Sequence, residues 1–363
     1  MRHLRVPSAQ TSHWIELCKS NGWYETGHRV QRIGEETAIP LNNLAPTEID
    51  PIWEAHPIIE IEASEKKNRY YWEHISDEIR HKFSDDFPQA FEVQGDVLLV
   101  KIPDEMTEAG QAIAQAMLEQ FPSIRVVCHD AGVEGEFRVR NLRVLKARAD
   151  NTSTQTRYRE HGHEFNINPA VAYFSGRLGS QRMRTFDAVS SLSVTKGRPL
   201  VVVDPYAGVG PSMALLYTDA TLVSKAYVND MNQEAIPLLE QNMQYFESRR
   251  KKEGTYHIDC MDARKLVVER PEMLGCADVL LVNLPHDSID HLPHILPLLS
   301  DGVSLLCGWS IQEKQTNVLS QLQSIFDASG RTVIDHQVEE VKGFSTAKAM
   351  FRYELILSNK NKR

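Results

Sequence analysis

The C-terminal half of the chain alternates short β-branched runs with helical stretches, and this pattern constrains the fold most strongly. From about residue 194 the apolar runs are LVVVDP, KAYVND, TYHIDC, DVLLVNLP, VSLLCGW and FRYELILS. Helices are expected between them, over QEAIPLLEQNMQYFESRR and QTNVLSQLQSIFDAS. Such alternation is typical of a parallel sheet covered by helices. Six such strands predict an open, doubly wound α/β domain that binds its ligand at the carboxyl ends of the early strands.

The preceding residues predict two smaller α/β domains. A chain of 363 residues exceeds what one hydrophobic core usually serves. Residues 1–62 combine a helix around SHWIELCKSNGW with short extended segments. Residues 63–170 begin with a polar connector helix, EKKNRYYWEHISDEIRHKF, and continue as strand, helix and strand from Gly95 onward. The third predicted domain, residues 171–363, contains the large sheet.

The composition argues against several classes of protein. The five cysteines never form a CxxC pair, so we expect neither a zinc ribbon nor a disulfide framework. No apolar stretch approaches the roughly 20 residues that cross a bilayer, and the first residues lack the apolar core of a secretory signal. We therefore expect a cytoplasmic protein with no membrane partner and no metal site. Nothing in the sequence requires more than a monomer.

The sharpest local motif is VVVDPYAGVGP, residues 201–211, in which an apolar strand ends at Asp204. Gly208 and Gly210 then open a turn before the next helix, where a Cβ atom would keep the backbone away from a ligand. Met213 occupies the position of the third glycine of a dinucleotide-binding fingerprint. The motif therefore argues against NAD and favours another ligand.

Polar residues also follow the next three strands of the predicted sheet. Asp230 ends the second strand, Asp262 follows the third, and Asn283-Leu284-Pro285 follow the fourth. Carboxylates at such positions suit ribose hydroxyls and an adenine amino group. In register, these strand ends have the layout of a Rossmann-like class I S-adenosylmethionine (AdoMet) methyltransferase domain. The predicted cofactor-binding residues are Asp204, Tyr206, Ala207, Gly208, Gly210, Asp230, Asp262 and Asn283.

Basic residues cluster although the formal net charge is −9. One cluster lies within GEFRVRNLRVLKAR, and a second lies within SGRLGSQRMR. A negative total argues against a chain coated in nucleic acid, but phosphate binding depends on where the charges gather. The two clusters are therefore compatible with a local basic face.

Taken together, the motifs resemble the archaeal and eukaryotic tRNA (guanine-37-N1) methyltransferase family, including its wybutosine-pathway AdoMet-dependent relatives. The residues that carry the resemblance are DPYAGVGP, DMN, DAR and NLP, with REHGHEFNINPAVAYFSGRLGSQRMR upstream. GDVLLVKIPDE is similar to the start of the family's middle domain, and WIELCKSNGWYETGHRVQRIGEETAIPL to its small first domain. The resemblance implies AdoMet as cofactor and tRNA as partner, bound at the anticodon stem-loop and, through the first domain, at the tRNA body.

The resemblance also implies roles for single residues. Arg177 matches an arginine that stabilises negative charge on the guanine O6, while Asn283 and Pro285 match the pair that holds the base edge. Either Arg138 or Arg140 matches a further catalytic arginine, and Arg140 is taken as that residue. The basic residues expected to contact RNA are Arg138, Arg143, Arg182 and Arg184.

The chain departs from the family at Gln181, where the family has a glutamate as general base. A neutral amide is a very poor base for the guanine N1 proton. His286 or Asp287 could replace the base. Alternatively, the reaction could be AdoMet-dependent aminocarboxypropyl or methyl transfer to a tricyclic wybutosine-type guanosine, or the chain could bind tRNA with weak catalysis. Asn-Leu-Pro favours methyl transfer, because the aminocarboxypropyl relatives usually have another motif there.

Overall fold

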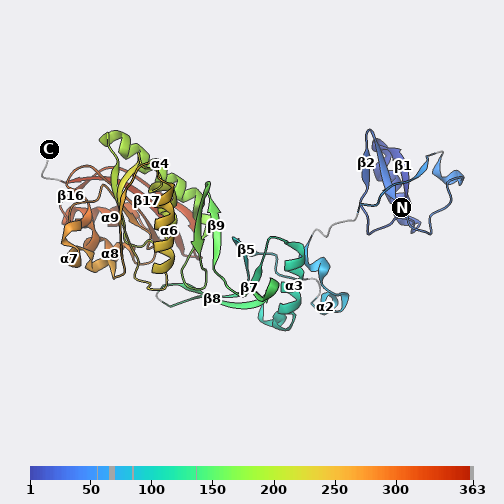
Figure 1. Cartoon of the computed structure of the whole chain (residues 1–363), viewed down its shortest axis with the longest axis horizontal. Coiled ribbons are helices and arrows are strands. Elements are labelled where there is room, and N and C mark those ends of the chain that lie inside the picture. The colour runs from blue at the N-terminus through green and yellow to red at the C-terminus, as the bar shows by residue number, and fades with distance from the viewer. Residues whose placement is uncertain (55, 65–69, 84–85, 136, 360–363) are drawn as a thin grey trace. The chain divides into compact units, whose positions relative to one another are not determined.

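The computed structural model describes residues 1–54, 56–64, 70–83, 86–135 and 137–359 (Figure 1). These residues form two compact units, Met1–Ser76 and Asp77–Arg363. Among the described residues, no helix combines the length and the apolar character needed to cross a bilayer.

The first unit is a small antiparallel sheet packed against one helix. Its strands are β1 (Arg2–Pro7), β2 (Gln31–Ile33), β3 (Glu36–Pro40) and β4 (Ile58–Glu60), in the order β2-β3-β1-β4. Helix α1 (Thr11–Ser20) buries Trp14 and Cys18. These side chains meet Leu4, Ile39 and Trp53 in one apolar cluster. Short 3-10 helices span Ser8–Gln10, Pro51–Trp53 and Tyr71–His74.

The predicted connector helix is wrong over residues 70–83. Residues 65–69 of that prediction lie outside the described residues, and the remainder forms the 3-10 helix Tyr71–His74 and helix α2 (Asp77–Lys82). Between them Ile75 is extended, with φ −83° and ψ 141°. Its side chain is buried, and burial of this apolar residue favours the break over a continuous polar helix.

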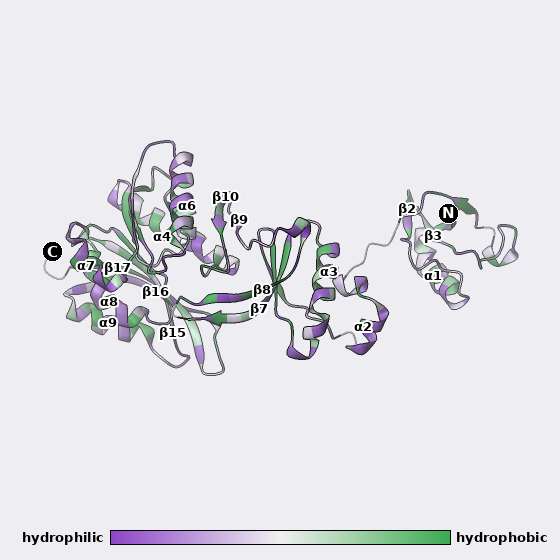
Figure 2. Ribbon diagram, turned by 60° about the horizontal axis from the view of Figure 1, so that its bottom comes forward, coloured by the Kyte–Doolittle hydropathy of each residue, from purple (hydrophilic) through white to green (hydrophobic). Residues whose placement is uncertain are grey.

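The second unit begins with a four-stranded sheet in the order β5-β6-β7-β8. Its strands are Phe91–Gln94, Val97–Val100, Val126–Glu134 and Val139–Ala147. Helix α3 (Gly110–Gln120), which follows the 3-10 helix Asp104–Ala109, joins β6 to its parallel neighbour β7. The long antiparallel pair β7–β8 extends from this sheet toward the larger one (Figure 2). The hairpin β9 (Thr156–Glu160) and β10 (His163–Ile167) follows the 3-10 helix Arg148–Asp150.

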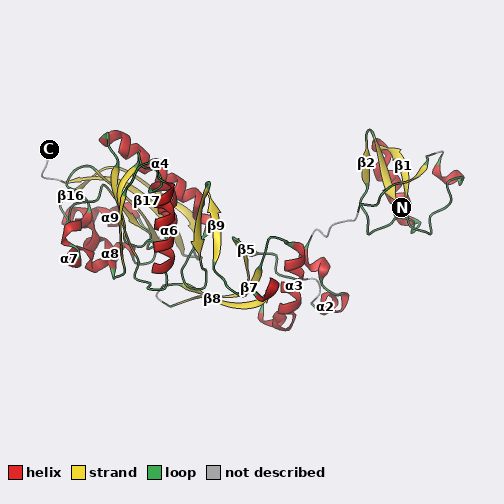
Figure 3. Ribbon diagram, viewed as in Figure 1, coloured by secondary structure: helices red, strands yellow, loops and turns green. Residues whose placement is uncertain are grey.

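The predicted open α/β sheet is confirmed, with the strand order β13-β12-β11-β14-β15-β17-β16. Figure 3 shows helices beside its strands. Strands β11 to β15 are parallel neighbours, and β17 runs antiparallel to both β15 and β16. Their bounds are Leu200–Asp204, Val223–Asn229, Thr255–Asp259, Val279–Val282, Ser304–Glu313, Arg331–Gly343 and Lys348–Asn359.

Helices and short helical turns connect these strands. The helices are α4 (Gly179–Lys196), α5 (Pro211–Leu216), α6 (Ile236–Arg249), α7 (Leu266–Glu269), α8 (Ser288–Ile295) and α9 (Val318–Ala328). The 3-10 turns are Gly176–Leu178, Ala263–Lys265, Pro271–Met273 and Leu296–Leu298. The sheet is buried on both faces, as its continuous apolar runs predict. Val202 and Leu281 join one apolar cluster, whereas Val203 and Leu280 join the other.

Six strands are predicted from the sequence, and the structure adds β16. Its sequence, RTVIDHQVEEVKG, contains no apolar run, and many of its side chains are exposed. An edge strand of this kind is defined by its hydrogen bonds to β17 rather than by local pattern.

The order of the strands along the sheet reverses between β11 and β14. In open α/β sheets this switch point is where ligands bind.

Candidate active site

The glycine turn after β11 has the backbone geometry that its sequence predicts. Gly208 and Gly210 have φ values of +56° and +80°, a region that glycine adopts without strain. A Cβ added at Gly210 would lie 2.9 Å from Leu239 Cδ1, so α5 starts against α6 with no room for a side chain. At Gly208 an added Cβ would meet only the Tyr173 carbonyl oxygen, at 3.9 Å. The space beside Gly208 is therefore open.

Asp230 holds this turn from the neighbouring strand. Its carboxylate accepts the Gly208 N–H at 2.7 Å and the Asn232 N–H at 2.9 Å. The Ala207 N–H donates to the Asn229 carbonyl at 2.9 Å and adds a second link between β11 and β12. Burial raises the pKa of Asp230, although its two backbone donors act in the opposite direction. The acid at the end of β12 thus orders the loop that would face a ligand.

Asp204 and Asn283 meet across the switch point. Asn283 follows β14, and its Nδ2 lies 3.3 Å from both carboxylate oxygens of Asp204. The Tyr206 N–H also donates to this carboxylate, at 3.3 Å. Asp204 is 1% exposed. Its burial raises its pKa to about 7, and the nearby charge of Asp230 adds to the shift.

The third and fourth strand ends carry further contacts. Asp262 pairs with Arg264 at 2.7 Å, and these hydrogen bonds lower the pKa of Asp262 to about 2. Its carboxylate therefore stays ionised and is already engaged by a cation. The Tyr206 hydroxyl lies 2.9 Å from His291 Nδ1 on α8. Pro285 is fixed through its carbonyl oxygen, which accepts the Ile311 N–H of β15 at 2.7 Å.

The segment before α4 contains Arg177 and Gln181. Arg177 is exposed in the short helix Gly176–Leu178. Gln181 lies in the first turn of α4, and its Oε1 is buried without a hydrogen-bond partner among the described residues. A buried acceptor without a donor is unusual in a folded protein. It marks Gln181 as a residue whose amide oxygen is available to a donor from a ligand or water.

Arg182 is engaged within the chain, and its contact with RNA stays a prediction. Its guanidinium donates to both carboxylate oxygens of Glu160 at 2.6 Å and to the Ser175 carbonyl at 3.0 Å. It also lies 5.3 Å from the centroid of the Phe174 ring. The pair is almost wholly buried, so the structure gives Arg182 a different role. It ties the segment that carries Arg177 to the β9–β10 hairpin.

The structure also separates Arg138 from Arg140. The Arg140 side chain is 15% exposed and pairs with Glu92 at 2.9 Å and with Asp130. It is thus held inside the four-stranded sheet, and the prediction of a catalytic role does not agree with this position. Arg138 is exposed at the turn between β7 and β8. It lies close enough to His286 to lower the pKa of that imidazole.

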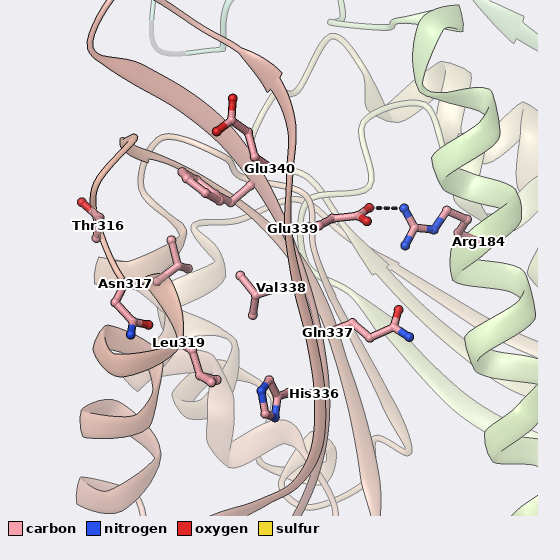
Figure 4. A pocket seen from close by; sticks show the side chains of 11 residues that line it. Arg184, Thr316, Asn317, Leu319, His336, Gln337, Val338, Glu339 and Glu340 are labelled. Carbon is pink, nitrogen blue, oxygen red and sulfur yellow. Dashed lines mark hydrogen bonds and ion pairs between the residues drawn. The ribbon is translucent and has the colours of Figure 1, made fainter.

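Arg184 and Arg143 have contrasting environments. Arg184 points from α4 to Glu339 of β16, with which it forms an ion pair (Figure 4). The pair borders a groove of about 780 Å³ between β16 and the start of α9. None of the predicted cofactor-binding residues lines this groove. Arg143 is exposed on β8, so its proposed contact with RNA stays a prediction.

Comparisons with known proteins identify two domains in the chain. Residues 156–314 match the model of the TRM5/TYW2 methyltransferase domain, and residues 71–146 match that of the TYW2 N-terminal domain. The chain therefore contains a TRM5/TYW2 methyltransferase domain over residues 156–314. A curated relative is the tRNA (guanine(37)-N(1))-methyltransferase Trm5b of Pyrococcus abyssi. It is 30% identical over 216 residues, which cover 59% of this chain and 58% of the relative.

Two solved structures share the fold of this chain. An aTrm5–tRNALeu complex superposes with a TM-score of 0.67 at 20% identity, covering 98% of this chain and 99% of the other. P. horikoshii TYW2 in complex with MeSAdo gives a TM-score of 0.59 at 17% identity, covering 78% and 99%. At these identities the likeness concerns the fold alone.

One contact at the site cannot be identified from local motifs. Arg264 stands in the DAR motif, two residues after its partner Asp262, but His291 follows its partner Tyr206 by 85 residues. Glu160 lies in the segment REHGHEF, which carries part of the resemblance, but the sequence does not indicate that Arg182 is its partner. Within the described residues, no group of three or more His, Cys, Asp or Glu side chains could hold a metal ion.

Proposed function

We propose that the chain transfers the methyl group of AdoMet to N1 of guanosine 37 in tRNA. The observation that carries this proposal is the Asp204–Asn283 contact across the switch point, directly beside the ordered glycine turn. Relatives of the same family that carry the name tRNA (guanine(37)-N(1))-methyltransferase support the choice of reaction. The chain is matched over 58% of the length of the first of these relatives.

The residues at the strand ends fit AdoMet. The open space beside Gly208 admits a ligand, and the acids at the ends of β11 and β12 suit a cation and ribose hydroxyls. When bound, AdoMet supplies a methyl group on a positively charged sulfur. The residues proposed to hold it are Asp204, Tyr206, Ala207, Gly208, Gly210, Asp230 and Asp262.

Asn283 and Pro285 are proposed to hold the guanine. The Nδ2 of Asn283 is directed at Asp204, which leaves its Oδ1 free to accept a hydrogen bond from an N–H on the base edge. The backbone of Pro285 is fixed to β15 and keeps this edge in place. Orientation of this kind provides a large part of the acceleration of a bimolecular step.

Arg177 is proposed to stabilise the negative charge that develops on the guanine O6 as N1 loses its proton. An exposed guanidinium can approach that oxygen from the segment before α4. Arg138 is a better second cation than Arg140, because only Arg138 is exposed near the Asn-Leu-Pro loop. Electrostatic stabilisation by such groups is commonly the largest single catalytic contribution.

The N1 proton needs an acceptor other than Gln181. His286 follows Pro285, and burial together with Arg138 lowers the pKa of its imidazole. A lowered pKa keeps the ring neutral at pH 7, the form that accepts a proton. Asp287, the next residue, is the second candidate. The buried Oε1 of Gln181, which has no hydrogen-bond partner among the described residues, is instead suited to accepting a hydrogen bond from the base.

We further propose the functional division of the chain into residues 1–62, 63–170 and 171–363. The first part would contact the tRNA body, and the exposed Arg138 and Arg143 of the second would contact the anticodon stem-loop. The protein would act as a cytoplasmic monomer, since the proposed site is formed by one chain.

The experiment is single-turnover transfer from labelled AdoMet to an unmodified tRNA transcript with G37, followed by nucleoside mass analysis. Wild type should give 1-methylguanosine, and Asn283→Ala should slow the transfer severely. Asn317→Ala is the matched control, because Asn317 caps α9 in the same unit and lies outside the proposed site. A product heavier by an aminocarboxypropyl group, or cofactor binding without any product, would overturn the proposal.

A further inference from the structure

The turn between β16 and β17 brings an exposed aromatic ring to the Asn-Leu-Pro loop. Phe344 is 46% exposed. Its ring centroid lies 5.4 Å from that of His286, and the two planes meet at 76°. His286 directly follows Pro285, so the pair of rings borders the residues proposed to hold the guanine. An exposed aromatic ring in this place offers a surface on which a nucleobase can stack.

Both rings stand on ordered backbone. The N–H groups of Phe344 and Ser345 each donate to the Lys348 carbonyl at 2.9 Å, and the Lys348 N–H donates to Ser345 Oγ at 3.0 Å. The loop on the other side is fixed by the 2.7 Å bond from the Ile311 N–H to the Pro285 carbonyl. Because the backbone that carries these rings is already ordered, a ligand that stacks on them pays less entropy on binding.

Two cationic residues lie near the His286 ring. Arg138 and Lys348 are both exposed, and both act electrostatically on His286, with Asp287 as the opposing charge. Arg138 comes from the β7–β8 turn and Lys348 from the start of β17. Three segments that are distant in sequence thus place two cations around two rings, in a chain whose net charge is −9. This combination is the one by which proteins bind unpaired nucleotides.

We propose that Phe344 and His286, flanked by Lys348 and Arg138, form a stacking site for an unpaired nucleobase that neighbours the modified guanine in the RNA loop. The inference rests on the proposed function, because that function places the modified base against Asn283 and Pro285. The next base along the strand then faces the rings beyond Pro285, and its phosphates face the two cations. Stacking tolerates any base, so the site would order the loop without reading its sequence.

The test measures the affinity of the full chain for a tRNA transcript, and the KM and kcat of modification, for Phe344→Ala, Phe344→Trp and Lys348→Ala. Tyr245→Ala is the matched control, since Tyr245 is a 40% exposed aromatic residue on α6, away from this loop. We expect Phe344→Ala to raise the RNA Kd about 5- to 150-fold, the range for one stacked base. Phe344→Trp should preserve affinity, and its fluorescence should be quenched by RNA.

Further readouts separate stacking from folding and from the proposed function. Phe344→Ala should raise KM for tRNA more than it lowers kcat, with AdoMet affinity unchanged. Lys348→Ala should reduce the slope of log K against log salt concentration by about 1, the contribution of one phosphate contact. RNA affinity of Phe344→Ala equal to that of Tyr245→Ala would overturn the stacking site, as would equal losses in Phe344→Ala and Phe344→Trp. If wild type modifies no tRNA, the proposed reaction fails, while these affinities still decide the stacking site.

Discussion

Binding of AdoMet should strengthen as the pH rises from 6 to 8, because Asp204 ionises over this range. Burial holds the pKa of Asp204 at about 7, and the charge of Asp230 contributes to the shift. The sulfonium of AdoMet is a cation, so it favours the ionised acid and lowers its pKa on binding. Asp262, with a pKa of about 2, stays ionised throughout and adds no pH dependence.

The magnitude follows from the ionised fraction of Asp204. With a pKa of about 7, about 9% of the carboxyl groups are ionised at pH 6 and about 90% at pH 8. If the bound form is fully ionised, the Kd for AdoMet falls about tenfold between these pH values. This change equals about 1.4 kcal/mol in binding free energy.

Isothermal titration at pH 6, 7 and 8 and constant ionic strength measures the effect. S-adenosylhomocysteine provides the ligand control, because it has the same amino and carboxyl groups but a neutral sulfur. Asp204→Asn provides the protein control, because the amide keeps the shape but does not titrate. The ratio of the two ligands' affinities should change with pH in the wild type and stay constant in the variant. A ratio independent of pH in both proteins would refute the assignment of a titrating Asp204 at the cofactor site.

The same group governs stability without cofactor. The pKa of Asp204 is 3.8 in the unfolded chain and rises to about 7 in the folded chain. Between these pH values the folded chain therefore keeps a proton that the unfolded chain releases. Unfolding free energy should therefore fall as the pH rises from about 4 to about 7, by at most about 4 kcal/mol. Asp204→Asn should remove this fall, and hydrogen exchange of β11 peptides reports it locally.

Three further changes test the site. Gln181→Glu should speed single-turnover transfer by up to about 10²–10⁴-fold, and an unchanged rate would show that another group already removes the proton. Glu160→Gln should lower kcat more than AdoMet affinity, because it weakens the two 2.6 Å bonds that hold Arg182; Glu160→Asp should recover part of the loss, and equal defects in both would contradict the positioning role. Gly210→Ala should destabilise the large sheet by about 1–3 kcal/mol, since φ is +80° and the new Cβ would press on Leu239; a melting temperature equal to that of wild type would argue against this strain.

Local sequence patterns were enough to predict the large sheet and which polar residues stand at the carboxyl ends of its strands. The apolar runs of β11 and β14 are long enough to require burial on both faces, and the acids and glycines directly follow them. Because carboxyl ends of parallel strands share one edge of a sheet, Asp204 and Asn283 had to lie near each other once the strand order was known. The polar strand β16 lacked any such run, and its pairing with β17 was not predictable from pattern.

The sequence by itself determined which groups stand at the carboxyl edge of the sheet: the glycine turn after β11, the acids at three strand ends and the loop that begins at Asn283. Only the tertiary structure decided which basic residues have acidic partners within the chain. Arg182 is neutralised by Glu160, 22 residues away, and Arg184 pairs with Glu339, 155 residues away. Arg138 remains exposed beside His286. The physical reason is that a side chain's charge is fixed by its residue type, whereas its burial and its partner depend on packing between distant segments.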